Sequence, residues 1–473
     1  MNFNALTQFE CFSATLASEV QNMSRDTMSP SRRIFISQIL EGILSEQAEE
    51  PSQLDGLDGL GVNLKTSIAN IRSLLSPIHR LPPELLTRIF TCICIPTWLA
   101  IEEAPEILEL ASVCGRWREI ILSTPSLWAN IGFDTIGWLD EAATGPKEFG
   151  TYLPRLVRAV RLFLARSETA PLNLSLGLVD LDETWSHNMM DLMDSVAEMK
   201  ERWRDVDFDF SRCSLSQLDH PSFARLCRPP PLSLERLTLA PPICCLLLQI
   251  SPDPQSLLQG FESCPLLTSL ELNVPPLVQQ WSRLSLPWRQ ITNLQISTID
   301  TLSLVEMLRG TPELKELRIT SVRITDDSEI ESAPNPISLV MLEYLALEHS
   351  TDAPYTLRHF TFPRLLTLLL PSDKAENQWN HPHFTEFLER SSCTITHLRI
   401  GAFSGPGLDI LQLFPRLKSL CIEETVISGV FMPSCSRIFT EAFLHQLFEL
   451  VLMNHEPSSS YPFRTIPSLQ TLH

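Results

Sequence analysis

The sequence is poor in glycine and has no long apolar run. Only 16 glycines stand against 36 prolines in 473 residues, which favours turns fixed by proline over turns that need glycine. The longest apolar run, Ile243 to Leu248, is far shorter than the roughly 20 residues of a membrane-spanning helix. The opening stretch MNFNALTQFECFSATLASE lacks the basic and apolar regions of a signal peptide. We therefore expect no membrane segment and an intracellular protein, cytoplasmic and/or nuclear.

Basic residues are also scarce. The 36 lysines and arginines are outnumbered by 56 aspartates and glutamates, which gives a formal net charge of -20. The sequence shows no basic cluster of the kind that neutralises a phosphate backbone, so the composition argues against nucleic acid as the main ligand. Solubility explains the acidity most simply, and a preference for a basic partner is the alternative.

The cysteines and histidines do not form a metal-binding pattern. Cys92-x-Cys94 and the adjacent pair Cys244-Cys245 have no second pair at zinc-ligand spacing. The other candidate cluster is made of His381, His383 and His397, near Trp379. Isolated histidines in a loop are more often simply solvated than bound to a metal. We expect no metal and no cofactor.

Catalytic motifs are missing as well. The sequence has no G-x-x-x-x-G-K phosphate loop, no H-E-x-x-H pair, no G-x-S-x-G elbow and no G-x-G-x-x-G after a strand. We predict no catalytic residue and a protein that is not an enzyme. A hydrolase or transferase whose groups converge only in space is an alternative.

What the sequence does contain is a strongly patterned stretch from Ser76 to Ile131. Pro82 and Pro83 before Glu84 predict a helix start, because proline tolerates the first helical position and a carboxylate suits the positive end of the helix dipole. An apolar face follows at Leu85, Leu86, Ile89 and Phe90. A second apolar series fits a helix interrupted or bent near Gly115, with members Leu110, Val113, Trp117 and Ile120.

The runs LPPELLTRIF, SVCGRWREI and STPSLW resemble an F-box, a small helical module. The matching positions are Leu81, Pro82, Glu84, Leu85, Leu86, Ile89, Phe90, Val113, Cys114, Trp117, Leu127 and Trp128. Between Phe90 and Leu110 the chain is longer than the common linker of the family. F-box proteins dock on the Skp adaptor of a cullin-RING ubiquitin ligase, so the resemblance implies the same partners here.

The resemblance also implies an adaptor-binding surface. Its residues are Leu81, Pro82, Pro83, Glu84, Leu85, Ile89, Phe90, Val113, Trp117 and Trp128. Apolar residues at helical spacing are more often core than interface, and both tryptophans suit the core of the module itself. Leu81, Pro82 and the outward side of the first helix are better candidates, because so small a module cannot bury both faces of its helices.

A second pattern, [L/I]-x-x-L-x-[L/I], recurs nine times in the second half of the chain. Its first positions are Leu234, Leu267, Ile291, Leu314, Leu342, Leu365, Ile395, Leu417 and Leu447. Consecutive first positions lie between 22 residues (Ile395 to Leu417) and 33 residues (Leu234 to Leu267) apart, which is the spacing of a solenoid. The central L-x-L alternates as a strand does, with both leucines facing the core. This array resembles leucine-rich repeats, although the Asn or Cys that the family places after the strand is missing.

The two patterns predict an α/β fold, with a small all-α F-box-like module followed by a curved leucine-rich-repeat solenoid with a parallel sheet. We expect residues 1–30 to be disordered, 31–75 to form a short helical segment, 76–133 the F-box-like module and 151–473 the repeat domain. The residues between the strand leucines would line the concave face: Thr238, Glu271, Gln295, Arg318, Ala346, Leu369, Arg399, Cys421 and Val451. Because they are chemically mixed, a solvated surface without a ligand is as well supported as a binding surface.

The combination predicts the substrate-receptor subunit of a Skp-cullin-F-box type ubiquitin ligase. The F-box would bind the Skp adaptor and the repeats an unknown protein substrate, with no nucleic acid and no membrane as partners. Such a receptor acts by raising the local concentration of a lysine near the ubiquitin carrier. The substrate-binding residues stay unknown. The alternative is a ligase-independent scaffold or sensor, in which the helical module packs against its own repeats.

Overall fold

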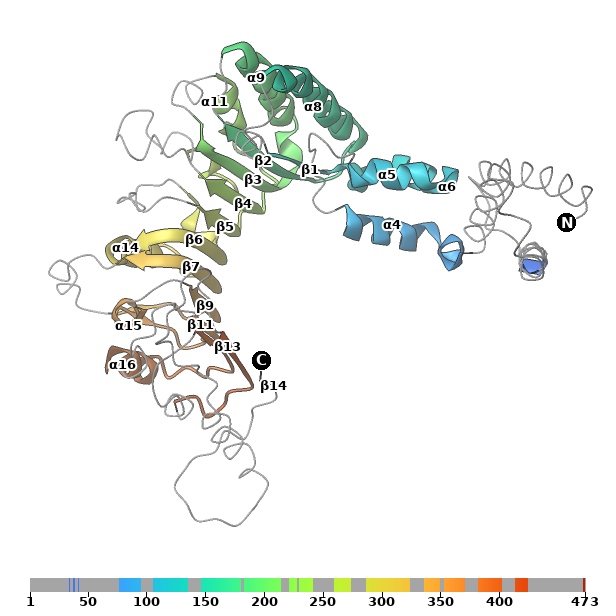
Figure 1. Cartoon of the computed structure of the whole chain (residues 1–473). Helices are drawn as coiled ribbons and strands as arrows, with labels where there is room; N and C mark the ends of the chain where they lie inside the picture. Colours follow the sequence, from blue (N-terminus) through green and yellow to red (C-terminus); the bar gives the residue numbers. More distant parts are fainter. Residues whose placement is uncertain are drawn as a thin grey trace, which may run out of the picture. The chain divides into compact units, whose positions relative to one another are not determined.

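The whole chain is represented by a computed structural model (Figure 1). The structure describes residues 34, 37–38, 41, 76–94, 105–134, 146–179, 183–213, 221–227, 229–240, 259–273, 286–323, 336–348, 353–370, 382–401, 413–423 and 471–472. Residues 1–30, nearly all of 31–75 and the ninth repeat with Val451 lie outside the described residues. The chain divides into two compact units, one of residues 1–134 and 143–174 and the other of residues 135–142 and 175–473.

The first unit is mainly helical. Its described elements are η2 (Pro77–Arg80), α4 (Pro83–Ile93), α5 (Glu106–Val113), α6 (Gly115–Leu122), η3 (Pro125–Trp128), β1 (Asn130–Asp134) and α8 (Pro146–Arg166). α4 starts at Pro83 with Glu84 in its first turn, as the proline pair predicts. α5 and α6 are separated by Cys114, whose extended backbone (φ -159°, ψ 167°) ends one helix and precedes the next. The predicted interruption near Gly115 is confirmed.

Aromatic side chains join the helices of the first unit. The ring of Phe90 on α4 packs on that of Trp117 on α6, with 4.9 Å between the ring centroids. Trp128 meets Phe163 of α8 edge-on at 5.0 Å, and its Nε1 donates a hydrogen bond of 2.8 Å to the carbonyl oxygen of Ile121. These contacts pack the short helices and α8 around one apolar core.

The second unit is built on strands that follow one another in chain order, and the first of them, β2, begins in the last three residues of the first unit. They are β2 (Leu172–Val179), β3 (Trp203–Arg212), β4 (Arg236–Ala240), β5 (Ser269–Leu272), β6 (Asn293–Asp300), β7 (Glu316–Arg323), β9 (Tyr344–Leu347), β11 (Thr367–Leu370), β12 (His397–Gly401), β13 (Ser419–Glu423) and β14 (Thr471–Leu472). Each neighbouring pair from β3 to β14 runs parallel. β8 (Ile337–Ser338) and β10 (Phe360–Thr361) form a small parallel pair of their own.

The repeat leucines lie in register across this sheet. One row consists of Leu237, Leu270, Leu294, Leu317, Leu345, Leu368, Leu398 and Leu420. Every member is at most 2% exposed, because each unit covers the apolar side of its neighbours. The predicted α/β fold, a helical module followed by a repeat solenoid with a parallel sheet, is confirmed.

Helices lie along one side of the sheet. They are α9 (Glu183–Ala197), α11 (Pro221–Cys227), α14 (Thr301–Arg309), α15 (Ala353–Leu357) and α16 (Pro382–Ser391). Figure 1 shows α14, α15 and α16 beside the stack of strands. Asp300 caps the start of α14, and its side chain accepts a hydrogen bond of 2.8 Å from the amide of Ser303. The opposite face of the sheet is the concave face, which carries the residues between the leucines.

Backbone hydrogen bonds connect successive repeats just before the strands. The carbonyl oxygen of Thr268 accepts from the amides of Thr292 and Asn293 at 2.8 and 3.1 Å. In six further repeats the carbonyl oxygen of the residue after the first leucine or isoleucine accepts from the next repeat in the same way; these residues are Glu235, Thr292, Lys315, Glu343, Leu366 and Thr396. This ladder fixes the register of the sheet without the missing Asn or Cys positions.

Tight turns precede these strands. The amide of Leu314 donates to the carbonyl oxygen of Thr311 at 3.3 Å, and the same bond across three residues recurs in other repeats. Three of these turns have proline at their second position, namely Pro312, Pro363 and Pro415. The φ angle of proline suits that position, so proline fixes the turn before the strand in these three repeats.

Candidate functional site: two docking surfaces

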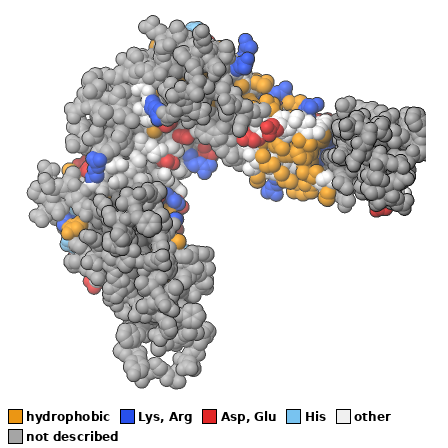
Figure 2. Space-filling view, in the orientation of Figure 1, with side chains coloured by type: hydrophobic (Ala, Val, Ile, Leu, Met, Phe, Trp, Pro, Cys, Tyr) orange, Lys and Arg blue, Asp and Glu red, His pale blue; other side chains and the backbone are white. Residues whose placement is uncertain are grey.

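The F-box-like helices carry an exposed apolar surface. On α4, Leu86 and Phe90 are fully buried, whereas Leu85, Ile89 and Ile93 are 43%, 38% and 49% exposed. These three residues follow one another at intervals of four, so they form one stripe along the helix. We call Leu85, Ile89 and Ile93 the α4 stripe. Figure 2 shows apolar side chains gathered over this part of the chain.

The structure divides the predicted adaptor-binding residues into two groups. Pro82, Pro83, Glu84, Leu85, Ile89 and Val113 are exposed, and Leu81 is half-buried. Phe90, Trp117 and Trp128 are 0%, 8% and 1% exposed and form part of the core. The side chains of these three aromatic residues therefore hold the helices together, and the surface open to a partner is narrower than the predicted set.

Sequence reasoning missed three large exposed apolar residues of the module, one of which is Leu122 at the end of α6, 43% exposed. Ile93 continues the α4 stripe by one more turn, and Leu108 on α5 is 43% exposed. The spacing of four between Leu85, Ile89 and Ile93 was the available signal for Ile93. No comparable signal marks Leu108, because Leu110 has similar neighbours and is half-buried.

A hydrogen bond ties the start of α4 to α6. Nη2 of Arg116 donates to the carbonyl oxygen of Leu81 at 2.5 Å. The carbonyl oxygen of Pro82 then accepts from the amide of Leu86 at 3.2 Å, which begins the helix. Because Leu81 and Pro82 directly precede the α4 stripe, the bond from Arg116 fixes where this stripe begins.

A buried thiol closes the other end of α4. Cys94 is 1% exposed. Burial raises the pKa of its thiol to about 11, and the negative charge of Glu106 adds to the increase. The thiol therefore stays protonated at neutral pH and packs as a small apolar side chain.

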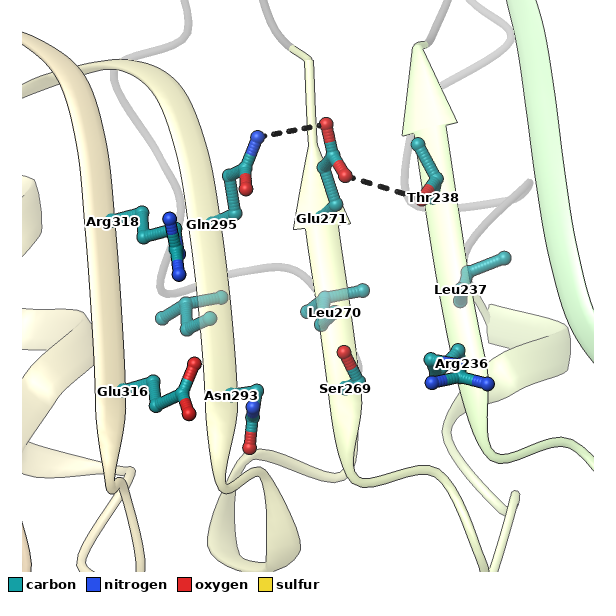
Figure 3. A pocket seen from close by; sticks show the side chains of 11 residues that line it. Arg236, Leu237, Thr238, Ser269, Leu270, Glu271, Asn293, Gln295, Glu316 and Arg318 are labelled. Carbon is teal, nitrogen blue, oxygen red and sulfur yellow. Dashed lines mark hydrogen bonds between the residues drawn. The ribbon is translucent and has the colours of Figure 1, made fainter. Parts of the chain in front are cut away.

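The concave face is the second surface. Across the strands, Thr238, Glu271, Gln295, Arg318, Ala346, Leu369, Arg399 and Cys421 stand in one row. Glu271 accepts hydrogen bonds from Gln295 at 3.0 Å and Thr238 at 3.4 Å, as Figure 3 shows. The row therefore lies where the alternation of the motif predicts it.

A hollow lies on the concave face between β4 and β7. Its volume is about 220 Å³, and its lining includes Arg236, Glu271, Gln295, Glu316 and Arg318 (Figure 3). Nε and Nη2 of Arg236 each donate to an Asp205 oxygen at 2.8 Å. This two-point ion pair closes one side of the hollow.

Arg318 and Tyr344 meet on the other side of the hollow. The guanidinium carbon of Arg318 lies 4.3 Å from the centroid of the Tyr344 ring. Burial raises the pKa of the Tyr344 hydroxyl, while the positive charge of Arg318 opposes that increase. The phenol is thus neutral at physiological pH and sits beneath a stacked cation.

The histidine cluster of the sequence is only partly described. Nδ1 of His383 lies 3.2 Å from a carboxylate oxygen of Glu386, and its ring meets Tyr355 edge-on at 5.5 Å. His381 and Trp379 lie outside the described residues. Within the described ranges, no group of three or more His, Cys, Asp or Glu side chains is placed to hold a metal ion.

Comparisons with known proteins place a family match on the helical module. Residues 78–134 match the F-box-like family, so this region is an F-box-like domain. Among solved structures the chain is similar to one described as the crystal structure of the Rad7 and Elc1 complex in yeast. The identity is 16% and the TM-score 0.36, over 88% of this chain and 99% of that chain. A search of curated proteins gives no match.

None of the described helices is both long enough and apolar enough to cross a membrane.

Proposed function

We propose that this chain is the substrate-receptor subunit of a Skp-cullin-F-box type ubiquitin ligase. In this role its F-box-like domain binds the Skp adaptor, and through the adaptor a cullin-RING ligase, while the repeats hold a protein substrate. The observation that carries the proposal is the α4 stripe: an exposed apolar row inside the region that matches the F-box-like family.

The α4 stripe gives the adaptor a hydrophobic anchor. Leu85, Ile89 and Ile93 remain partly in water in this chain. Full burial of one such side chain contributes about 1.5–3 kcal/mol, and each of these would gain the part that is still exposed. The exposed rings of Pro82 and Pro83 extend this surface at the start of the helix. We assign the predicted residues Leu81, Glu84 and Val113 to the border of this apolar surface.

Phe90, Trp117 and Trp128 have an indirect role in this proposal. Phe90 supports α4 from beneath by packing on Trp117, and Trp128 joins η3 to α8. They set the position and orientation of α4 rather than touch the adaptor. Their substitution would lower adaptor binding together with the stability of the module.

The proposed receptor needs no catalytic group of its own. It would bring a lysine of the bound substrate close to the charged ubiquitin carrier, and the gain in rate comes from the raised local concentration. The repeat solenoid suits this task because it presents a long surface on parallel strands, as in other repeat proteins.

Co-purification with the Skp adaptor and a cullin tests the proposal. The wild-type chain should recover both proteins, and a variant with alanine at Leu81, Pro82 and Ile89 should recover much less of both. Leu162→Ala is a matched control, because Leu162 is 45% exposed on α8 of the same unit. If wild type and the triple variant recover the adaptor equally poorly, the proposal fails, and a ligase-independent scaffold becomes the better account.

A further inference from the structure

We propose that the concave face recognises an extended segment of a partner protein through one carboxylate side chain, aspartate or glutamate, which binds Arg318 beside Tyr344. This inference rests on the proposed function, since it names the chemical class of substrate that the repeats would hold.

Arg318 is the cation of the hollow that is open to a ligand. Arg236, the other arginine of the lining, is held by both oxygens of Asp205. Arg318 forms neither an ion pair nor a hydrogen bond with any residue in the described ranges, and its guanidinium carbon lies over the Tyr344 ring, 4.3 Å from the centroid. A cation–π contact forms no hydrogen bond, so the N–H groups of the guanidinium remain for an acceptor such as a carboxylate, which suits their fork geometry.

The neighbouring strand explains why Arg318 is held in this position. The register of β7 and β9 places Arg318 opposite Ala346 and Glu316 opposite Tyr344. Ala346 is the smallest side chain of its row, and its methyl group leaves space above β9 for the Arg318 side chain. The guanidinium therefore reaches over the Tyr344 ring. A cation fixed in this way loses little conformational entropy when an anion binds.

Tyr344 supplies the aromatic ring beneath Arg318. Burial raises the pKa of its hydroxyl, so the group remains neutral over the physiological range and adds no negative charge beside Arg318. Gln295 stands opposite Arg318 on β6, and its Nε2 is committed to Glu271 at 3.0 Å. Arg318 therefore keeps its donors for a ligand at the edge of the hollow, next to the Tyr344 ring.

The charges around Arg318 favour one negative charge over two. Glu316 lies two residues before Arg318 on the same strand and lines the same hollow, and Glu271 lines it as well. A single carboxylate balances the charge of Arg318. A phosphoryl group carries close to two negative charges near neutral pH and would meet repulsion from both glutamates. The structure therefore favours an acidic residue over a phosphorylated one.

The size of the hollow favours one side chain of a peptide. About 220 Å³ lies below the roughly 300–1,000 Å³ of pockets that enclose cofactors and other small molecules. The surrounding surface is a row of parallel strands with polar side chains at each step. Such a face can accept an extended chain that places one side chain in the hollow.

The test uses the full-length chain and a synthetic library of random linear peptides that also contains phosphoserine. Wild type should enrich peptides with Asp or Glu at one position. In the best of these peptides, replacement of that residue by its amide should weaken binding about tenfold in wild type. The same replacement should change binding less than about twofold in Arg318→Gln, because the partner of the carboxylate is then gone.

Two further variants keep the test decisive. Arg318→Glu should reverse the selection toward Lys or Arg. Arg364→Gln is the matched control and should select peptides as wild type does, since Arg364 is exposed and belongs to the turn before β11. Thermal unfolding midpoints equal to wild type show that the variants are folded. If Arg318→Gln fails this check, Arg318→Lys replaces it and should show a reduced preference for the acid.

The inference is wrong if no acidic position is enriched, if the preference survives in Arg318→Gln, or if phosphoserine is preferred to Asp and Glu. Adaptor binding is measured separately on the same proteins. Arg318→Gln should recover the Skp adaptor as wild type does. Absence of acid selection in a wild-type chain that recovers the adaptor overturns this inference and leaves the ligase role intact. Failure of adaptor recovery with intact acid selection does the reverse.

Discussion

The guanidinium of Arg116 donates a hydrogen bond of 2.5 Å to the carbonyl oxygen of Leu81, 35 residues earlier in the chain. It joins the first residue of α6 after Gly115 to the residue that precedes the proline pair of α4. The bond thus connects two helices that the chain separates by a linker, and it does so beside the α4 stripe.

We predict that Arg116→Met lowers the free energy of unfolding of the chain by about 1–2 kcal/mol, since a hydrogen bond from a charged donor is lost. Adaptor binding should weaken as well, because the start of α4 is no longer held. Arg88→Met is the control: Arg88 is exposed on α4 and makes no hydrogen bond within the described residues. Chemical denaturation of both variants measures the difference, and equal losses would contradict the role of Arg116.

The two core tryptophans should respond differently to the same substitution. Nε1 of Trp117 is buried without a hydrogen-bond partner among the described residues, whereas Nε1 of Trp128 donates to Ile121 at 2.8 Å. Both lose similar volume on replacement by phenylalanine. Trp128→Phe should therefore cost about 1 kcal/mol more than Trp117→Phe, which also removes an unsatisfied donor. Denaturation curves that show the opposite order would contradict the assignment.

The row of repeat leucines should tolerate little change. Leu317 is 1% exposed and lies between Leu294 and Leu345 in the register, so Leu317→Ala should cost about 2–5 kcal/mol. Leu366, on the turn before β11, is 42% exposed, and Leu366→Ala should change stability by less than about 0.5 kcal/mol. Hydrogen exchange should show faster opening of β6, β7 and β9 in the first variant alone. Similar exchange in both would contradict the packing.

Cys94 should be protected from alkylation while Cys92 reacts. Both lie near the end of α4, but Cys92 is exposed and Cys94 is buried. Iodoacetamide at pH 8 followed by mass spectrometry should label Cys92 first and Cys94 only on unfolding. Early labelling of Cys94 in the native chain would contradict its burial.

The same thiol predicts a pH dependence of stability. The pKa of Cys94 rises from 9.0 to about 11 on folding, so between these values the unfolded chain has lost a proton that the folded chain keeps. Its contribution to stability is complete below pH 9 and is lost as the pH rises toward 11. Cys94→Ala should flatten that part of the stability curve, and an unchanged slope would assign the loss to other groups.

The repeat strands could be predicted from the sequence because two independent signals mark each of them, one local and one from the repetition. The alternation of Leu237 and Leu239 with polar residues is the local signal of a half-buried strand, and its recurrence at solenoid spacing requires neighbouring units to stack. The register of Leu237 opposite Leu270 and beyond follows directly from that pattern. The placement of Arg318 on the concave face follows in the same way.

The burial of the α4 residues and the contacts between repeats could be seen only in the structure. Leu85 and Leu86 are adjacent apolar residues, and periodicity assigned them with Ile89 and Phe90 to one face. The structure instead separates an exposed pair, Leu85 with Ile89, from a buried pair, Leu86 with Phe90. The contact of Arg318 with Tyr344 joins two repeats, and no spacing within one repeat reveals it.

The affinity for the Skp adaptor tests the central claim most directly. We expect the purified full-length chain to bind the adaptor, and Leu85→Ala with Ile89→Ala to weaken the dissociation constant at least about tenfold, since two anchors lose apolar area. Leu162→Ala, an equally exposed leucine of the same unit, should leave it within about twofold. Absence of binding by the wild-type chain, or equal affinities for the double variant and wild type, would contradict the account.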